Sequence, residues 1–348
     1  MPVYLNAGAS SRDSSVVESS DTCINIGLIN NMPDGALRAT ERQFVNLLGS
    51  AAKGIVVRLS LYFLPEVPRT EAGLSHLNHG YSSVNDLWNS SLDGLIVTGA
   101  EPRAPELTDE PYWRSLTRVL DWAENNTSST IWSCLAAHAA LLHTGGIRRR
   151  RLVDKRFGVF GCTRTSDHPL TAGGPAVVRM PHSRWNDIPE NELADCGYRV
   201  LLSSPEAGVD TFVRQGKSLF VFFQGHPEYE ANTLLLEYRR DIERFLRRER
   251  DTYPLLPSGY FNPASAEILT ALRERTLCDP QGELFADFPV GLAETGISNT
   301  WHPMAARVYG NWLTFLCSQK ARRLKDRQRW KHPHTAEIEE LPDRRMGL

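Results

Sequence analysis

The chain alternates short apolar runs with longer segments in which apolar residues recur at helical spacing. Four runs have the length and the β-branched or aromatic content of buried strands: residues 23–29, 55–63, 92–99 and 130–133. Residues 37–48 and 112–125 between them show the spacing of amphipathic helices. Strands and helices in this alternation predict a mostly parallel sheet with helices on both faces.

Strands follow more closely in the second half of the chain. They are expected at residues 177–180, 199–202, 211–214 and 219–223. The short turns between some of them predict an antiparallel extension of the sheet. A long helix is expected at 231–250, a second helix at 264–275 inside a loop-rich stretch, and a third from about Pro303.

The ends of the chain differ in composition from its middle. Residues 1–22 include a Ser-, Asp- and Gly-rich stretch and are expected to form a flexible arm, and 319–348 read as a charged, exposed tail. Residues 23–318 then form one catalytic domain, with a segment near 264–296 that is longer than expected. No internal repeat is evident.

Composition narrows the class of protein. The 348 residues carry a net charge of −2, which argues against a general role on nucleic acid or membrane surfaces. No apolar run approaches the ~20 residues of a membrane span, and the N-terminus lacks the features of a signal peptide. The six cysteines lie far apart in the sequence, which indicates reduced thiols in a cytoplasm rather than a framework of disulfides.

One cysteine stands where chemistry is expected. Cys134 follows a predicted strand and directly precedes an Ala/Leu-rich helical stretch. The start of a helix carries partial positive charge and free N–H groups, which favour a thiolate and can hold an oxyanion. Ala136 and Ala137 keep the turn small. A zinc site made of Cys134 and His138 is disfavoured because no further Cys or His pair completes it.

A second motif supplies a base for that nucleophile. Gly225-His226-Pro227-Glu228 ends another predicted strand, and residues two apart can face the same side. Parallel sheets place their sites at such strand ends. A cysteine, a histidine and a carboxylate that aims the histidine form a nucleophile, a base and an orienting group. Together these residues indicate covalent acyl chemistry.

The same residues carry a resemblance that spans roughly residues 23–318. The chain resembles the homoserine O-acyltransferase family of methionine biosynthesis, which is built on a flavodoxin-like, class I glutamine-amidotransferase-like fold. The matching motifs occur in the family's order: I-G-L-I-N-N-M-P, T-E-R-Q-F-V-N-L-L, D-G-L-I-V-T-G-A, Tyr112-Trp113, C-L-A-A-H-A-A-L, F-G-V-F, M-P-H-S-R-W, G-H-P-E-Y-E, T-L-L-L-E-Y-R-R-D-I and G-N-W-L.

The resemblance assigns roles to the candidate residues. It implies that Cys134 accepts the acyl group from an acyl-CoA, that His226 is the base and that Glu228 orients it. The reaction is then ping-pong, with backbone N–H groups of Leu135 and Ala100 holding the oxyanion. The resemblance implies small-molecule substrates, acyl-CoA as co-substrate, no bound cofactor or metal, and a homodimer.

The resemblance also proposes residues for the amino-acid acceptor. Arg184, next to Ser183, and Arg240 match arginines that line the family's substrate pocket. Their planar guanidinium groups suit a carboxylate. Glu237, one turn before Arg240, is expected to face the substrate amine. Arg240 also shares its helix with several other arginines, so a solvent-facing position is the alternative.

Three departures from the family pattern affect the substrates. Asp34 and Gly35 stand where the family often has a lysine, and Arg38 is the nearest replacement cation. Arg103 occupies the position where glycine tends to accompany succinyl transfer and glutamate acetyl transfer. Because an arginine can pair with a second carboxylate, succinyl-CoA is the expected donor. The long segment 264–296 could reshape the pocket.

Several alternatives remain open from the sequence. The acyl group could be acetyl, and the acceptor could be L-serine or another hydroxy amino acid. A glutamine amidotransferase-type hydrolase uses the same triad, although glycines usually flank its cysteine where Ser133 and Leu135 stand here. A catalytically silent amino-acid or CoA sensor is a third possibility. The basic run 148–151 fits a solvated helix end better than a contact with CoA phosphates.

Overall fold

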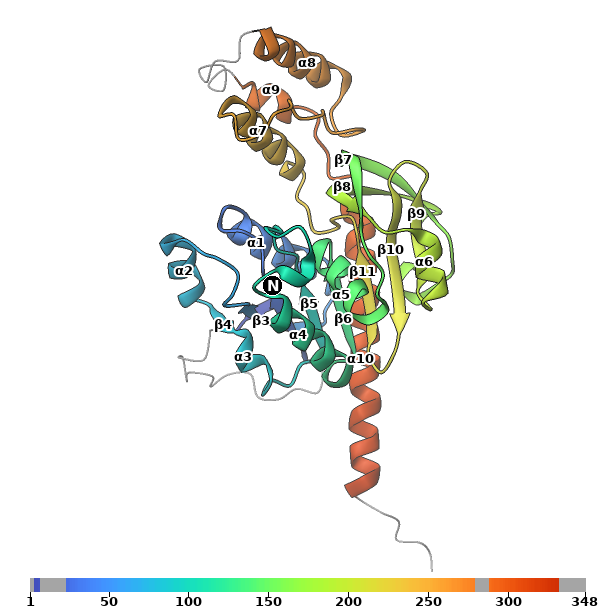
Figure 1. The fold of residues 1–348 in the computed structure, drawn as a ribbon. Coiled ribbons are helices and arrows are strands. Elements are labelled where there is room, and N and C mark those ends of the chain that lie inside the picture. The colour runs from blue at the N-terminus through green and yellow to red at the C-terminus, as the bar shows by residue number, and fades with distance from the viewer. Residues whose placement is uncertain (1–2, 7–22, 279–287, 332–348) are drawn as a thin grey trace, which may run out of the picture.

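The computed structural model describes residues 3–6, 23–278 and 288–331. A central sheet with helices on both faces forms the body of the molecule (Figure 1). Three helices, α7, α8 and α9, protrude from one end of this body, and the long helix α10 runs along it and extends past the other end (Figure 1).

Five parallel strands form the centre of the sheet in the order β3-β2-β5-β6-β11. This corresponds to the strand order 2-1-3-4-5 of flavodoxin-like folds and confirms the predicted architecture. The residues of β2, β5, β6 and β11 are almost all buried, as expected for strands covered on both faces, while half of those in β3 are only partly buried. The strands are β2 (Cys23–Ile29), β3 (Val56–Phe63), β5 (Gly94–Val97), β6 (Ser129–Ser133) and β11 (Leu219–Phe223).

The predicted antiparallel extension continues from β11. Four strands join in the order β10-β9-β7-β8, each antiparallel to its neighbour. They are β10 (Gly208–Gln215), β9 (Arg199–Ser204), β7 (Arg150–Arg164) and β8 (Val177–Asp187). Strand β7 was not among the predicted strands, and in its first part charged residues do not alternate with apolar ones. The register of β7 and β8 shifts between Arg151 and Arg156.

Helices cover the two faces of the parallel sheet. On one face, α1 (Asp34–Ala51) and α10 (His302–Lys331) bury Phe44 and Trp312 in one apolar cluster. On the other, α4 (Trp113–Asn126) and α5 (Leu135–Gly145) bury Leu120 and Ala137 in a second cluster. Helix α10 packs so closely on β5 that a Cβ at Gly94 would lie 2.7 Å from Leu316 Cδ1, so a larger residue there would displace side chains of α10.

The protruding helices have an apolar core of their own. Helices α7 (Thr233–Leu246), α8 (Pro263–Cys278) and α9 (Val290–Glu294) belong to this lobe. Tyr238 of α7 and Leu269 of α8 pack there with Phe157 of β7, which links the lobe to the sheet. Helix α7 is shorter than the predicted 231–250 and α8 slightly longer than 264–275.

Short elements fill the connections that the sequence left as loops. None is long enough to show a clear periodicity. They are α2 (Glu71–Asn78), β4 (Tyr81–Ser83), α3 (Val84–Leu87), α6 (Glu190–Asp195) and the 3₁₀ turns η1 (Leu107–Asp109) and η2 (Pro169–Thr171).

Both chain ends depart in part from the prediction. Within the expected arm 1–22, β1 (Val3–Leu5) pairs in parallel with β3, so that β1 forms the edge of the sheet. Residues 7–22 lie outside the described ones. Within the expected tail 319–348, helix α10 continues to Lys331, held by Lys320 and Arg323 on the carboxylate of Asp93 at 3.1 and 2.7 Å. Among the described helices, none combines the length and the apolar content needed to cross a membrane.

Candidate active site

Cys134 lies at a strained turn between β6 and α5. Its backbone has φ 51° and ψ −114°, a conformation that L residues rarely adopt and that costs about 1–3 kcal/mol. The turn is fixed from both sides: the Cys134 N–H donates to the Phe223 carbonyl at 2.7 Å, and the Cys134 carbonyl accepts from Ala137 at 3.0 Å. Strain at this position indicates a functional requirement on the direction of the thiol.

His226 reaches the same edge of the sheet from the neighbouring strand. Strands β6 and β11 are parallel and pair Ser133 with Phe223, so the residues after both strands emerge side by side. Cys134, His226 and Glu228 line one cavity of about 700 Å³. The predicted association of the sulfur and the imidazole, 92 positions apart in the sequence, is therefore present in the fold.

Two neighbours orient the imidazole. Its Nδ1 lies 2.9 Å from Glu228 Oε1, which leaves Nε2 for the thiol of Cys134. The ring also stacks on Tyr229, with centroids 4.2 Å apart and planes inclined by 15°. The backbone N–H of His226 donates to the Pro181 carbonyl at 2.8 Å. Ring and backbone are thus both held before substrate arrives.

The charge state of the pair favours nucleophilic chemistry. Burial alone would lower the pKa of His226, but the negative charges of Cys134 and Glu228, together with their hydrogen bonds, outweigh it and raise that pKa well above its usual value. The arrangement therefore favours a protonated imidazole beside Cys134. A thiolate is the reactive form of cysteine.

The predicted oxyanion donors belong to the turns that follow β5 and β6. Leu135 and Ala100 both line the cavity. Leu135 is the first residue of α5, where backbone N–H groups have no partner within the helix. A Cβ at Gly99 would lie 2.6 Å from Leu135 Cβ, so glycine is needed for the turn after β5 to approach the start of α5.

Acidic groups of α7 line the cavity next to Tyr229. Glu237 Oε1 accepts from the Tyr229 hydroxyl at 2.6 Å, and its Oε2 accepts from the Ser183 hydroxyl. Lys155 Nζ lies 3.4 Å from Glu237 and 3.0 Å from Asp241. Burial would raise the pKa of Glu237, but the charges of Lys155 and Arg240 lower it, so the carboxylate is ionised.

Arg240 also lines the cavity, as predicted, rather than facing only solvent. Its Nη2 lies 3.2 Å from Asp241 and 3.9 Å from Glu237, and its side chain is 46% exposed. Lys155 was not predicted. It lies on β7 at the register shift, and no motif in the sequence singles it out. Lys155 and Arg240 are two cations that line the cavity.

Arg184 is not in the cavity, contrary to the prediction. Its side chain is 2% exposed, and its guanidinium donates to Asp187 at 2.9 Å and to the carbonyls of Asn186 and Ala207. The reason is the period of two along β8: Ser183 and Trp185 line the cavity, so the residue between them points to the other face of the strand.

We predict that Arg184→Gln mainly destabilises the protein. The guanidinium is buried while Asp187 is 27% exposed, so loss of their pairing and of the hydrogen bonds to Asn186 and Ala207 should cost about 1.5–3 kcal/mol. Urea denaturation measures this loss. Arg164→Gln is a matched control, since Arg164 and Asp167 are also three residues apart but are 33% and 96% exposed. Unchanged unfolding, with a raised KM for the acceptor, would restore the predicted binding role.

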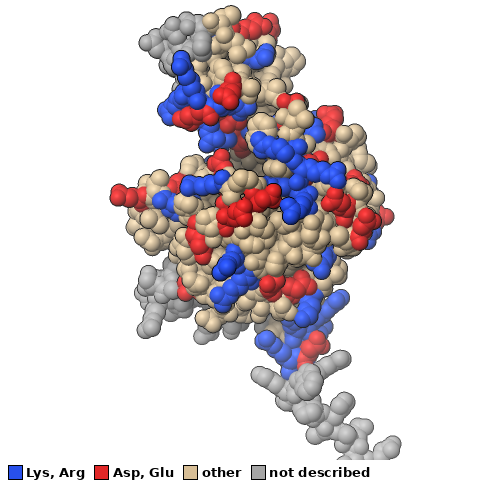
Figure 2. Space-filling model, in the orientation of Figure 1, with Lys and Arg blue, Asp and Glu red and all other residues tan. Residues whose placement is uncertain are grey.

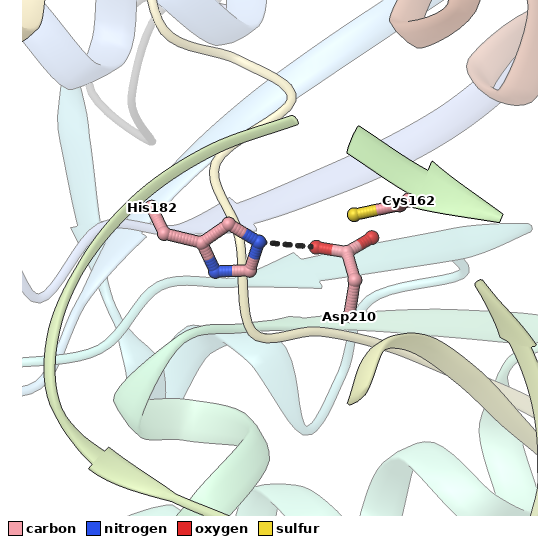
Figure 3. Close-up of side chains that lie close together, drawn as sticks. All are labelled: Cys162, His182 and Asp210. Atoms are coloured by element: carbon pink, nitrogen blue, oxygen red, sulfur yellow. Dashed lines mark ion pairs between the residues drawn. The ribbon is translucent and has the colours of Figure 1, made fainter. Parts of the chain in front are cut away.

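A buried polar cluster lies beneath the His226 turn (Figure 3). His182 Nε2 is 3.3 Å from Asp210 Oδ1, and ligand atoms of Cys162, His182 and Asp210 lie within 4.8 Å of one another. Burial raises the pKa of the Cys162 thiol, which opposes the thiolate that a metal would need. Asp210 Oδ1 instead accepts from the Gly225 N–H at 3.1 Å, so the cluster supports the turn that carries His226.

His138 does not join Cys134 in a metal site. Its Nε2 lies 3.1 Å from Gln224 Oε1, and burial lowers its pKa to about 3, so it is neutral. Gln224 in turn donates to the Val209 carbonyl at 2.7 Å. The contact between His138 and Gln224 ties helix α5, which begins after Cys134, to the segment that carries His226.

The remaining predicted cations lie outside the cysteine cavity. Arg38 is exposed and does not line it. The cation beside the Met32-Pro33 turn is Arg69, which donates to the Met32 carbonyl and pairs with Asp34 at 3.2 Å. Arg103 lines an adjoining depression of about 200 Å³, which shares Ala100 with the main cavity.

Two expectations about longer segments also change. Residues 148–151 are not a helix end, because α5 ends at Gly145 with Gly146 in the left-handed conformation and β7 begins at Arg150. Of this run only Arg151 lines the cavity. None of the described residues between 264 and 296 lines it, so within the described part α8 and α9 do not shape the pocket.

The fold and this site together define a class: α/β proteins with a Cys–His–Glu triad at the carboxyl edge of a flavodoxin-like sheet. Residues 10–323 match the family model for homoserine O-succinyltransferase, and the chain belongs to this family.

Curated relatives and a solved structure show the extent of the similarity. A homoserine O-succinyltransferase of Rhodopseudomonas palustris is 47% identical over 85% of this chain and 89% of its own length. One of Methylorubrum extorquens is 46% identical over 86% and 88%. A solved glutamine amidotransferase from Methylobacillus flagellatus is 15% identical, covers 84% of this chain and 95% of its own, and has a TM-score of 0.47.

Proposed function

We propose that this chain transfers a succinyl group from succinyl-CoA to the hydroxyl of L-homoserine, through a thioester on Cys134. The observation that carries the proposal is the single cavity that holds Cys134, His226 and Glu228. The names of the curated relatives support the choice of succinyl and homoserine over acetyl, L-serine and glutamine. The intact triad argues against a catalytically silent sensor.

The first half-reaction exchanges one thioester for another. The Cys134 thiolate attacks the carbonyl carbon of the donor, and the negative charge moves to the carbonyl oxygen, facing the N–H groups of Leu135 and Ala100. One such donor is typically worth about 3 kcal/mol in the transition state. The carbonyl then re-forms, the C–S bond to CoA breaks, and the departing thiolate takes the proton from His226.

The second half-reaction needs His226 as a base. Acylation removes the negative charge of Cys134, which is the strongest influence that raises the pKa of His226 against burial. The pKa therefore falls, and the neutral imidazole can accept the proton of the acceptor hydroxyl as the oxygen attacks the thioester. The released thiolate of Cys134 restores the initial charge state. One histidine thus serves both steps.

The part of the cavity wall around Glu237 suits a zwitterionic amino acid. Its ammonium group can approach the ionised Glu237, which Ser183 and Tyr229 hold in place. Its carboxylate can approach Arg240 or Lys155. Both contacts are charge-assisted, and together they would turn the hydroxyl of the side chain toward the acyl group.

Intact-mass measurement tests the proposal. Incubation with succinyl-CoA should add one succinyl group, and L-homoserine should remove it. Incubation with acetyl-CoA, removal by L-serine, and ammonia release from glutamine test the alternatives. A stable acetyl adduct without a succinyl adduct, or loss of the adduct with L-serine alone, would contradict the proposed substrates.

We propose that Arg103, which lines the adjoining depression, pairs with the free carboxylate of the succinyl group. We predict that Arg103→Glu lowers kcat/KM for succinyl-CoA about tenfold or more, because a charge-assisted contact becomes a repulsion. Acetyl-CoA, which lacks that carboxylate, should be affected much less. Steady-state rates with both donors measure the ratio, and an unchanged succinyl rate would exclude the pairing.

The homodimer and the cytoplasmic location that the sequence suggests remain predictions. Sedimentation of the full chain tests the first.

A further inference from the structure

A tryptophan that lines the cavity lies within cation–π distance of two arginines. The guanidinium carbon of Arg151 lies 4.5 Å from the centre of the Trp185 ring, and that of Arg250 lies 5.8 Å from it. The three residues come from β7, β8 and the segment after α7, and all line the cavity that contains Cys134. The site described above uses none of them.

Their charges are only partly compensated. Arg250 lies 3.5 Å from Asp241 and donates to the Thr252 carbonyl at 2.6 Å. Arg151 is exposed and has no ion pair among the described residues. Figure 2 shows Lys and Arg side chains gathered where the protruding lobe meets the body. Glu249 and Asp251 also line the cavity, so the local charge is mixed and recognition must come from individual arginines.

A ligand that matches this side of the cavity combines a flat aromatic ring with phosphates. Arginine binds phosphate oxygens bidentately and stacks on aromatic faces, and tryptophan offers the largest face for a base. On binding, a base can replace one guanidinium on the ring while that guanidinium turns to a phosphate. The acyl donor of the proposed reaction carries such a group at the end opposite its thioester.

We propose that Arg151, Trp185 and Arg250 form the subsite for the phosphorylated adenosine end of the acyl-CoA, while the thioester end reaches Cys134. The inference rests on the proposed function. It names a part of the cavity that the triad and the acceptor wall do not use, and it gives Arg151 the phosphate contact that the sequence left as the weaker alternative.

Two donors of different length test the subsite. Wild type, Arg151→Gln and Trp185→Leu are compared with succinyl-CoA and with succinyl-pantetheine, which has the thioester but neither phosphates nor adenine. Each variant should raise KM for succinyl-CoA about tenfold, the effect of losing one charge-assisted or stacking contact, with kcat unchanged. Rates with succinyl-pantetheine should not change. Arg250→Gln is a secondary variant, because it also removes the pairing with Asp241.

Arg150→Gln is the matched control. Arg150 directly precedes Arg151 on β7, pairs with Glu192 at 2.7 Å and does not line the cavity. Equal losses with both donors, or an unchanged KM for succinyl-CoA in both main variants, would overturn the subsite. Calorimetric binding of free CoA separates the two proposals: if wild type binds CoA and the variants bind it more weakly, the subsite holds even where no succinyl transfer occurs.

Discussion

Cys134→Ser is expected to abolish turnover, lowering kcat at least about 10³-fold, because a hydroxyl beside His226 does not ionise as a thiol does. Any acyl-serine that forms is an ester, and its oxygen is a poorer leaving group than the sulfur of a thioester in the second half-reaction. Intact mass with succinyl-CoA should then show no adduct, or one that L-homoserine does not remove.

The control for this variant is Cys196→Ser. Cys196 is free and exposed, and it does not line the cavity, so its replacement should leave adduct formation and turnover unchanged. A Cys134→Ser protein with wild-type rates would remove Cys134 from the mechanism and leave the strain at its backbone without a functional explanation.

The parts of the site that the sequence predicts are those fixed by strand ends. Cys134 and His226 each follow a short apolar run, and neighbouring parallel strands bring such positions to one edge. An apolar run that predicts a buried parallel strand therefore also predicts that the residue after it lies at the carboxyl edge of the sheet. The alternation of strands and helices predicts the parallel sheet, and the family resemblance implies its flavodoxin-like fold.

Side-chain direction within the extension is less accessible. Arg184 carries the chemistry of a carboxylate ligand, but its place between Ser183 and Trp185 turns it away from the cavity. Lys155 lies where β7 shifts register, and a shift of this kind leaves no pattern in a charged segment. Residue type indicates which chemistry is possible, and within the extension the pairing of β7 with β8 decides which side chains face the cavity.

The second large effect is expected for Glu228→Gln. Glu228 holds the proton of His226 on Nδ1 through a 2.9 Å contact, which leaves Nε2 free to accept. A glutamine amide can donate to Nδ1 and so favour the tautomer with the proton on Nε2, where it cannot act as a base. Loss of general-base catalysis typically costs 10²–10⁴-fold, and we expect about 10³-fold in the transfer from the acyl-enzyme to L-homoserine.

The pH dependence of this half-reaction tests the role of Glu228 independently. Transfer requires neutral His226, so its rate rises as the pH passes the pKa of the imidazole in the acyl-enzyme. Glu228 raises that pKa, and its neutralisation should move the rising limb to lower pH while the plateau falls. Single-turnover rates of preformed acyl-enzyme between pH 5 and 9 measure both. Glu230→Gln is the matched control, since Glu230 pairs with Arg42 at 2.6 Å and does not line the cavity. A limb that stays in place or moves to higher pH would show that Glu228 does not act through His226.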